Sequence, residues 1–524
     1  MPTRFDRNLI LVILLSVFAF APLTYPGFFQ SHSGFLSIFN LLDLDANLAH
    51  NWSWVPTVGR DLHLFIGEGP VPYALAQFFH LLGLGPADAV KAVYALAFIL
   101  SGLGLYAFAR TWLGASAALV ASVVYIYLPY HLATTYVRGS LGESLALALF
   151  PTILWAMTAE NSRTSPSRLI LAGLLVAMLI LTQAGLATLF VLVVLAYVTL
   201  ALPSRQGMAR RLVASGAGFV LGWLLFLPAI IRQGFRLTSA GDFYQHFVYP
   251  FQLLAADWEY GASQPGWRDT LPLQIGVIPV GLGLLSLFLL ASRKERNRGL
   301  RRTIIFFATT ATLLVVLTLP FSSPLWRVTL LSYLVQYPWQ LLALVGLAVS
   351  FLAGSVAALD ERLASFPIQA ALITMAILAS YTYLMPQFID HVPSEPPVAV
   401  LGENQIVLID YELKGPLRHG ATIRLRPRWQ ALKPLEKDYT IFVQVVDEQG
   451  TIWGQQDREP RDGDRPTTTW QPGEILEDEY EVTIDVEGPR QGYHIELGMY
   501  DVETGERMKA GPDRTSVTIQ GREQ

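Results

Sequence analysis

The sequence predicts a polytopic α-helical membrane protein that ends in an all-β sandwich domain. Of its 524 residues, 52% are hydrophobic and 15% are charged, and the mean hydropathy is +0.40. Several apolar runs before residue 390 reach the ~20 residues that a helix needs to cross a bilayer. After about Pro393 these runs give way to short alternating segments separated by turns, which is typical of β-strands. We therefore predict a transmembrane domain at residues 1–390 and an extracytoplasmic β-sandwich at residues 391–524.

Composition excludes several classes of function. The formal net charge is -4, which gives no indication of nucleic-acid binding. Cysteine is absent, so disulfides, thiolate metal sites and a cysteine nucleophile are excluded. The nine histidines show no HExxH-like spacing, and the sequence predicts no metal-ligating residues. A divalent cation is the one cofactor left open.

The first predicted span covers residues 8–22. Arg4 and Arg7 precede or open it and place the N-terminus in the cytoplasm by the positive-inside rule. A secretory signal peptide is the alternative, but no small-x-small cleavage site follows the apolar run. We therefore expect a retained first helix.

Residues 27–88 form a long external segment that is too polar in places to cross the membrane. It contains two amphipathic stretches, 35–48 and 73–84, which we expect to lie on the outer leaflet as helices. A carboxylate in this segment could act as a base or hold a metal. Asp43 and Asp45 are instead assigned to a solvated helix face, because residues two apart do not share a face.

The further spans follow from hydropathy, and every arginine-rich loop between them falls on one side of the membrane. They are predicted at residues 89–113, 115–132, 140–159, 169–182, 186–203, 212–231, 273–291, 303–319, 338–359 and 367–384. The result is about eleven spans, with the N-terminus inside, the C-terminus outside and further external loops at 232–272 and 320–337. The break at residues 182–185 is where two spans could merge or one could split.

Arg138 and Glu143 stand where the span at 140–159 begins. Charges at that depth are costly and usually face a partner or a water-filled cavity. Glu143 lies in the first helical turn, where the helix dipole favours an anion. Arg138 lies just before that turn, where it can meet a phosphate or a carboxylate. The structural alternatives are an Arg–Glu pair that closes the loop and an arginine that snorkels to lipid headgroups.

The C-terminal region alternates in the manner of short antiparallel strands. These strands are predicted at residues 406–412, 422–429, 440–446, 451–457, 479–484, 494–500 and 515–519. Trp429, Trp453 and Trp470 could stack on sugar rings. We favour their assignment to the core of the sandwich, because large aromatic side chains are mostly buried there.

Residues 87–155 carry most of the matches to a known family. The matching residues are Lys91, residues 100–106, Tyr130-His131-Leu132, Tyr136-Val137-Arg138-Gly139, Glu143 and Leu154-Trp155, with residues 73–83 and Tyr337-Pro338-Trp339 elsewhere. This pattern resembles the membrane family labelled 6-pyruvoyl-tetrahydropterin synthase-related, which is similar to the C-type glycosyltransferases of the GT-C fold. The β-rich tail resembles a sandwich appended to such proteins in some bacteria. The label implies no pterin chemistry, because the chain lacks the zinc-binding histidine set of pterin synthases.

The resemblance implies a carboxylate base in the first external loop and cations that stabilise a phosphate leaving group. The family pattern would put His-Asp where this chain has His32-Ser33, and a serine cannot serve as that base unaided. Asp61 and Glu68 lie in the same loop and are the candidate catalytic residues. The candidate substrate-binding residues are His32, Arg60, Arg138, Glu143 and Arg268.

Three hypotheses about function follow. The first is a glycosyltransferase-like protein of the plasma membrane that moves a sugar from a polyprenyl-phosphate donor to a glycan, lipid or protein acceptor on the outer face. The second is a catalytically degenerate member that acts as a scaffold or accessory subunit of a membrane complex, with other membrane subunits as partners. The third is a transporter of lipid or polysaccharide, for which the sequence shows no pair of interrupted helices in matching halves.

Overall fold

A computed structural model of the protein describes residues 6–50, 67–158, 165–202, 207–233, 242–255, 259, 263–292, 297–389, 392, 397–402, 405–510 and 514–520. Arg60 and Asp61 lie outside these described residues. The chain divides into two compact units, Met1–Tyr25 with Leu62–Gln387 and Pro26–Asp61 with Phe388–Gln524. The helical and β-rich parts therefore separate close to the predicted residue 390, but the first part of the external loop groups with the β-rich unit.

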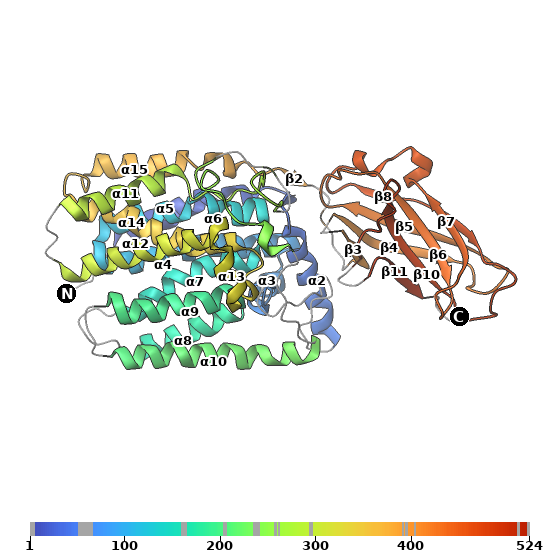
Figure 1. Ribbon diagram of the computed structural model, residues 1–524, viewed down its shortest axis with the longest axis horizontal. Helices are drawn as coiled ribbons and strands as arrows, with labels where there is room; N and C mark the ends of the chain where they lie inside the picture. The colour runs from blue at the N-terminus through green and yellow to red at the C-terminus, as the bar shows by residue number, and fades with distance from the viewer. Residues whose placement is uncertain are drawn as a thin grey trace. The chain divides into compact units, whose positions relative to one another are not determined.

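The first unit is a bundle of apolar helices that run side by side (Figure 1). Its helices are α1 (Arg7–Phe20), α3 (Pro70–Leu81), α4 (Pro86–Leu113), α5 (Ala115–Ile126), α6 (Pro129–Ala133), α7 (Leu141–Met157), α8 (Pro166–Ile180), α9 (Ala184–Ala196), α10 (Met208–Gln233), α11 (Val277–Ser292), α12 (Arg298–Thr318), α13 (Ser323–Val328), α14 (Leu342–Leu359) and α15 (Phe366–Leu378). Shorter 3₁₀ and π-helical turns join several of them.

The predicted count of about eleven spans is not confirmed. Within the described residues, six helices are long and apolar enough to cross a membrane, or seven if the pair Ala115–Ile126 and Pro129–Arg138, bent by 42°, is one span. That pair breaks at Pro129, because proline lacks the N–H that would continue the helix. Four more predicted spans coincide with apolar helices that are only 10–17 residues long: α7, α8, α11 and α15.

Helices α7 and α14 form the centre of the bundle, since nearly every residue of both is buried. Small residues let neighbouring helices approach them closely. A Cβ on Gly354 of α14 would lie 2.5 Å from the Cβ of Ala121 in α5. A Cβ on Gly104 of α4 would likewise lie 2.4 Å from Oγ1 of Thr152 in α7.

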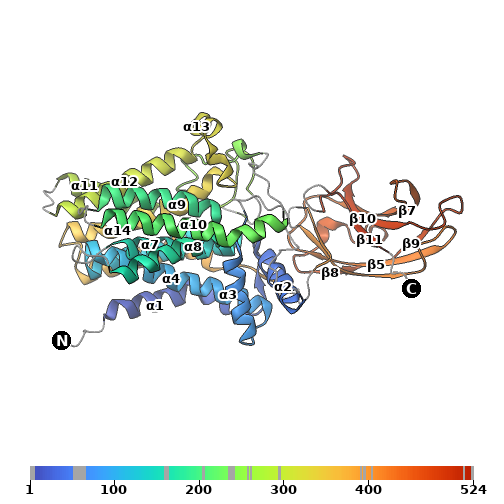
Figure 2. The same ribbon diagram turned by 90° about the horizontal axis from the view of Figure 1, so that it is seen from below.

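Two hydrogen bonds to the region of α1 mark the opposite ends of the bundle. At one end, Tyr106 Oη of α4 donates to Oδ2 of Asp6, just before α1, at 2.6 Å. At the other, Tyr136 Oη donates to the carbonyl of Ala19, near the end of α1, at 2.7 Å. Figure 2 shows α3 and α13 away from the start of α1, toward the end of the bundle where α1 finishes. This is the end that the positive-inside rule predicts to be external.

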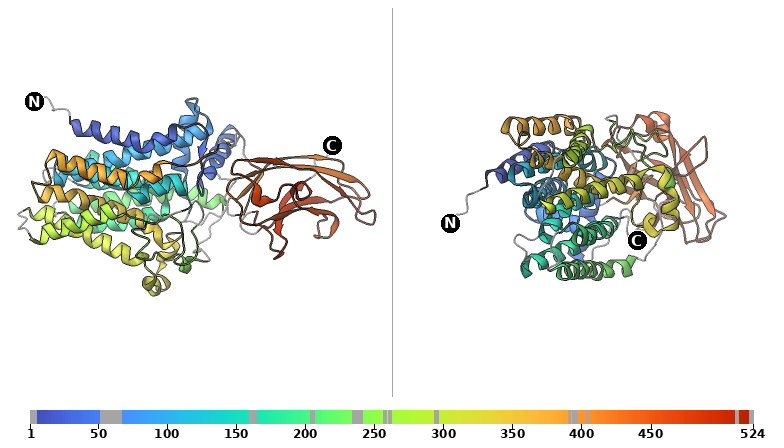
Figure 3. Two further views of the ribbon diagram at one scale, coloured as in Figure 1. Left: turned by 90° about the horizontal axis from the view of Figure 1, so that it is seen from above. Right: turned by 60° about the vertical axis from the view of Figure 1, so that its left-hand side comes forward.

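The second unit contains two antiparallel sheets around one hydrophobic core (Figure 3). One sheet has the order β11-β10-β6-β7, and the other β3-β4-β5-β8, with β9 also paired to β5. The strands are β3 (Ala399–Leu401), β4 (Ile406–Lys414), β5 (Thr422–Ala431), β6 (Tyr439–Val446), β7 (Ile452–Arg458), β8 (Ile475–Glu477), β9 (Tyr480–Thr483), β10 (His494–Asp501) and β11 (Val517–Gln520). Each predicted strand is present, and the short strands β3 and β8 were not predicted.

The tryptophans of this unit belong to its core. Trp429 and Trp470 are buried, as the sequence analysis favoured. Trp453 is half-buried against the same core, and its Nε1 donates to Oδ2 of Asp447 at 2.8 Å. None of these three indoles is therefore presented as an open platform for a sugar.

Part of the external loop also belongs to the second unit. Strand β1 (Phe28–Phe29) pairs with β2 (Phe388–Ile389), and α2 (Gly34–His50) follows β1. The assignment of Asp43 to a solvated face is wrong, because Asp43 is buried. It lies one turn after the buried Phe39, on the apolar face of α2.

Candidate functional site

The site is built around the turn that enters α7. A π-helical turn, Thr134–Arg138, ends at Gly139, which has a left-handed φ of 67° that glycine adopts without strain. Ser140 then caps α7, with its Oγ accepting from the backbone N–H of Glu143 at 3.4 Å. This sequence of turn, glycine and cap brings Arg138 back over the first turn of α7, where Glu143 lies.

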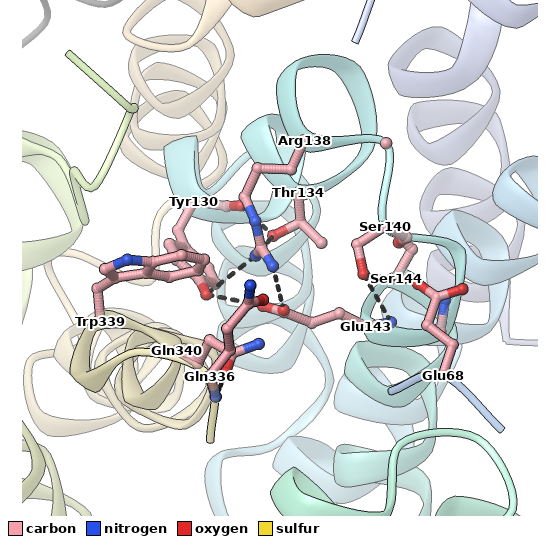
Figure 4. A network of polar contacts seen from close by, with 12 residues as sticks. Glu68, Tyr130, Thr134, Arg138, Ser140, Glu143, Ser144, Gln336, Trp339 and Gln340 are labelled. Carbon is pink, nitrogen blue, oxygen red and sulfur yellow. Dashed lines mark hydrogen bonds and ion pairs between the residues drawn. The ribbon is translucent and has the colours of Figure 1, made fainter. Parts of the chain in front are cut away.

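Arg138 and Glu143 form a buried ion pair (Figure 4). Nη2 of Arg138 lies 2.7 Å from Oε2 of Glu143, and the two side chains are 10% and 0% exposed. Tyr130 Oη donates to Oε1 of Glu143 at 2.7 Å and accepts from Nη1 of Arg138 at 3.3 Å. The structural alternative, an Arg–Glu pair that closes the loop, is therefore present, and ligand binding by either residue stays a prediction.

The indole of Trp339 covers the guanidinium group of Arg138. Cζ of Arg138 lies 4.4 Å from the centroid of the Trp339 ring, a cation–π contact. Trp339 belongs to the 3₁₀ turn Pro338–Leu341, which leads into α14. Its Nε1 donates to Oγ of Ser263 at 3.2 Å, so the orientation of the indole depends on a distant loop.

That loop contains a polar cluster which sequence reasoning missed. Ser263 Oγ donates to Oδ2 of Asp269 and lies 2.8 Å from Nδ1 of His246. Nε2 of the buried His246 lies 2.8 Å from Oδ2 of Asp242, and its ring stacks on Tyr337 with centroids 4.1 Å apart. Burial raises the pKa of Asp269, against the lowering effect of the hydrogen bond from Ser263. Asp242 and His246 are only four residues apart, but no local signal in the sequence connects them to Ser263, Asp269 and Tyr337.

Glu68 lies on the other side of Ser140 from Arg138 (Figure 4). Its Oε1 accepts from Oγ of Ser140 and from the backbone N–H of Gly142, both at 2.9 Å. Its Oε2 accepts from Oη of Tyr73 at 2.6 Å. Burial raises the pKa of Glu68, and the hydrogen bonds from Tyr73, Gly142 and Ser140 oppose this rise.

The backbone around Glu68 is fixed to the break between α8 and α9. Gly69 N–H donates to the carbonyl of Thr182 at 2.9 Å, and Val71 N–H donates to the carbonyl of Leu181 at 3.1 Å. Gly142 leaves room for this approach, because a Cβ there would lie 2.9 Å from Cγ of Glu68. The break at residues 182–185, which the sequence analysis singled out, therefore forms one wall of the site.

The other predicted site residues lie elsewhere. His32 belongs to the second unit, where Lys433 Nζ donates to its Nδ1 at 2.8 Å. Arg268 is exposed, and its Cζ lies 5.1 Å from the ring centroid of its neighbour Trp267. Of the predicted residues that the structure describes, it thus brings Glu68, Arg138 and Glu143 together, whereas no contact joins His32 or Arg268 to them among the described residues. Among the described residues, no group of three or more histidines, aspartates or glutamates could hold a metal ion.

No protein-family model and no curated protein match this chain, so the 6-pyruvoyl-tetrahydropterin synthase-related label has no support. Solved structures do match. One is the arabinofuranosyltransferase AftD from Mycobacteria, with a TM-score of 0.48 and 17% identity over 74% of this chain and 28% of that chain. Another is the oligosaccharyltransferase of Archaeoglobus fulgidus, with a TM-score of 0.43 and 14% identity over 73% of this chain and 55% of that chain.

A third is ArnT from Cupriavidus metallidurans bound to undecaprenyl phosphate, with a TM-score of 0.33 and 14% identity over 74% of this chain and 90% of that chain. These neighbours are glycosyltransferases of the GT-C fold. The chain spans about a quarter of the mycobacterial chain and about half of the archaeal one. At these TM-scores the similarity carries no argument about chemistry, which has to come from the side chains.

Proposed function

We propose that this chain is a membrane glycosyltransferase-like protein that moves a sugar from a polyprenyl-phosphate donor to an acceptor hydroxyl on the outer face. The observation that carries the proposal is the position of Glu68. Three donors hold the Glu68 carboxylate on one side of the start of α7. The buried Arg138 lies on the other side of the same turn. A base and a phosphate ligand around one turn are what an inverting transfer requires.

In this proposal Glu68 is the general base. A carboxylate has about four lone-pair sites. Oε1 of Glu68 uses two of them for Ser140 and Gly142, and Oε2 uses one for Tyr73, which leaves one site on Oε2 for an acceptor hydroxyl. The proton of the acceptor hydroxyl passes to Oε2 of Glu68 as the oxygen of that hydroxyl attacks the anomeric carbon of the donor sugar. A pKa raised by burial makes Glu68 a stronger base than an exposed glutamate.

Arg138 is the proposed ligand of the departing phosphate. As the bond from the anomeric carbon to the phosphate oxygen breaks, the phosphate gains negative charge, which a guanidinium can stabilise through two parallel hydrogen bonds. The described residues offer no set of three ligands for a divalent cation, so no step is assigned to one. Membrane lipid and a glycan, lipid or protein acceptor are the partners in this proposal.

A non-catalytic scaffold or accessory subunit is the second candidate. One observation favours it: Glu143 already neutralises Arg138. The transporter hypothesis gains no support from the described residues, in which the buried Arg138 and Lys91 are each paired with a carboxylate.

The test is transfer of a labelled sugar from polyprenyl-phosphate donors by the purified full-length protein. We expect Glu68→Gln to lower the rate by about 100-fold or more, as loss of a general base does. Arg138→Ala should lower it as well, and Asp61→Asn tests the other candidate base. Glu481→Gln and Arg428→Ala, on exposed ion pairs of the second unit, are the matched controls. Donor binding without turnover would support the scaffold, and absence of donor binding would contradict the transferase.

A further inference from the structure

The positive charge of Arg138 is already matched inside the protein. Glu143 meets one end of the guanidinium at 2.7 Å, Tyr130 meets the other nitrogen, and Trp339 covers one face. The side chain is 10% exposed, so little of the charge reaches solvent. Glu68 adds a second carboxylate close enough to interact with Arg138. The described charges around this turn therefore sum to neutral or negative, which does not attract an anion.

Nη2 of Arg138, which pairs with Glu143, is one of the nitrogens that a phosphate would use. A guanidinium fork fits a carboxylate and a phosphate with the same planar geometry. A phosphate placed beside the intact pair would lie within a few ångströms of the Glu143 carboxylate, and like charges at that distance repel in a medium of low dielectric. An anion can therefore bind to Arg138 with full strength only after Glu143 has left it.

Stability alone does not account for such a pair. A buried ion pair is often no more stabilising than apolar side chains of the same volume, because removing two charges from water is costly. Arg138 is also the last residue of a π-helical turn, and such turns occur frequently at functional sites. Glu143 has a second partner, Tyr130, which can keep one carboxylate oxygen while the other releases Arg138.

We propose that Glu143 is an internal substitute for phosphate, and that a phosphate group binds Arg138 by displacing it. The inference rests on the proposed function and names the step that admits the donor. The ligand class is a phosphate mono- or diester, either free or at the head of a lipid. In the resting protein Glu143 thus neutralises the charge of Arg138 and prevents other anions from binding it. A phosphate binds by taking the place of the Glu143 carboxylate.

The experiment measures binding of inorganic phosphate and of undecaprenyl phosphate to the full-length protein in detergent by calorimetry. Glu143→Gln should bind both probes at least tenfold more tightly than the unchanged protein, because Arg138 loses its internal anion. The double variant Arg138→Gln, Glu143→Gln should lose this gain. Glu412→Gln, which removes a carboxylate paired with Lys414 and Arg426 on the exposed sheet, should leave binding unchanged.

Equal or weaker binding by a Glu143→Gln variant that unfolds cooperatively would overturn the inference. So would tighter binding of undecaprenyl phosphate alone, because the gain would then come from the lipid chain. If Glu143→Gln does not fold, Glu143→Asp decides in its place, since its carboxylate stands one methylene farther from Arg138 and should tighten binding by a smaller factor. Tighter phosphate binding by Glu143→Gln, together with no sugar transfer by the unchanged protein, would uphold this inference and contradict the proposed function. The two failures are therefore distinguishable.

Discussion

At the scale of single residues, the donors around Glu68 set how strongly its carboxylate holds a proton. Burial raises its pKa above the ordinary value of 4.5, and the hydroxyl of Tyr73 is the largest influence that lowers it again. A general base works only when it is deprotonated, so its pKa appears as the acid limb of the pH–rate profile. The pKa of Glu68 therefore depends on the hydroxyl of Tyr73.

We expect Tyr73→Phe to move the acid limb of sugar transfer to higher pH. Removing the hydroxyl takes away a hydrogen bond that favours the ionised carboxylate, so the pKa of Glu68 rises and the rate falls sooner as pH decreases. The measurement is the transfer rate between pH 4 and about 8. Tyr381→Phe, at an exposed position, should leave the profile unchanged. A limb that does not move would argue against Glu68 as the base.

Gly142 allows a second prediction at this scale. A Cβ there would lie 2.9 Å from Cγ of Glu68 and 3.0 Å from the carbonyl oxygen of Thr182. We expect Gly142→Ala to displace Glu68 and to lower the free energy of unfolding by about 1–3 kcal/mol, as overpacking does. Thermal unfolding of the purified protein gives the stability, and the transfer assay gives the effect on Glu68.

Gly216→Ala is the matched control for that variant. Gly216 is also helical, but a Cβ there would meet nothing within 4 Å. The change should be neutral or stabilising by up to about 1 kcal/mol, because alanine favours a helix over glycine. Equal effects of the two alanines would show that the close approach of Glu68 to Gly142 is unimportant.

At the scale of elements, a loop and a 3₁₀ turn together hold the indole of Trp339 over Arg138. Ser263 receives Nε1–H of Trp339 and contacts His246, whose ring stacks on Tyr337. The 3₁₀ turn that carries Trp339 is therefore fixed from the side of the loop at 242–269 as well as by α14. Both elements therefore position the indole that covers Arg138.

We expect Ser263→Ala to destabilise the protein by about 1–3 kcal/mol, because it leaves polar groups of His246 and Trp339 without this partner. It should also alter tryptophan fluorescence by releasing the indole of Trp339. Ser167→Ala, at an exposed position near the start of α8, should change stability by less than about 0.5 kcal/mol. If Ser263→Ala behaves like this control, the cluster does not position Trp339.

At the scale of the whole molecule, the chain crosses between its two units more than once. Residues 26–61 leave the helical unit, join the second unit and are followed by a return to the bundle. Strand β1 pairs with β2, and His32 accepts from Lys433. The β-rich unit is therefore not a simple C-terminal addition, because part of the predicted first external loop depends on it.

A chain that ends at Gln387 should lose protection in this loop. Without β2, strand β1 has no pairing partner, and an isolated two-stranded pair is marginal even when complete. We expect chymotrypsin to cleave at Phe28, Phe29 or Phe35 faster than in the full chain. Lys433→Ala, which keeps β2, should retain protection at Phe28. Unchanged cleavage in the shortened chain would mean that the loop is held by the helical unit.

The predicted orientation can be tested because the chain has no cysteine of its own. Glu448→Cys, on an exposed turn of the second unit, should react with a membrane-impermeant maleimide on intact cells. Glu361→Cys, in the exposed turn after α14, should react only after the membrane is opened. The reverse pattern would invert the topology and place Glu68 on the cytoplasmic side.

The sequence by itself determined which segments are helices and which are strands. Runs of apolar residues and two-residue alternation are local properties, so the predicted spans coincide with helices and the seven predicted strands are present. It also brought Arg138 and Glu143 to one helix start, where an ion pair was one of the alternatives, and the structure shows that pair. The number of complete spans was not determined, since four of the predicted spans coincide with helices of only 10–17 residues and one pair of helices is bent by 42°.

Only the tertiary structure decided which distant residues meet. Ser140 holds Glu68 across 72 positions of the chain, and Trp339 reaches Ser263 across 76. It also decided that His32 belongs with the β-rich unit and that Asp43 is buried. Such contacts arise from packing between elements, which leaves no periodic or local signal in the residues that take part. The sequence supplied the charged groups, and the packing of the helices selected which of them share a site.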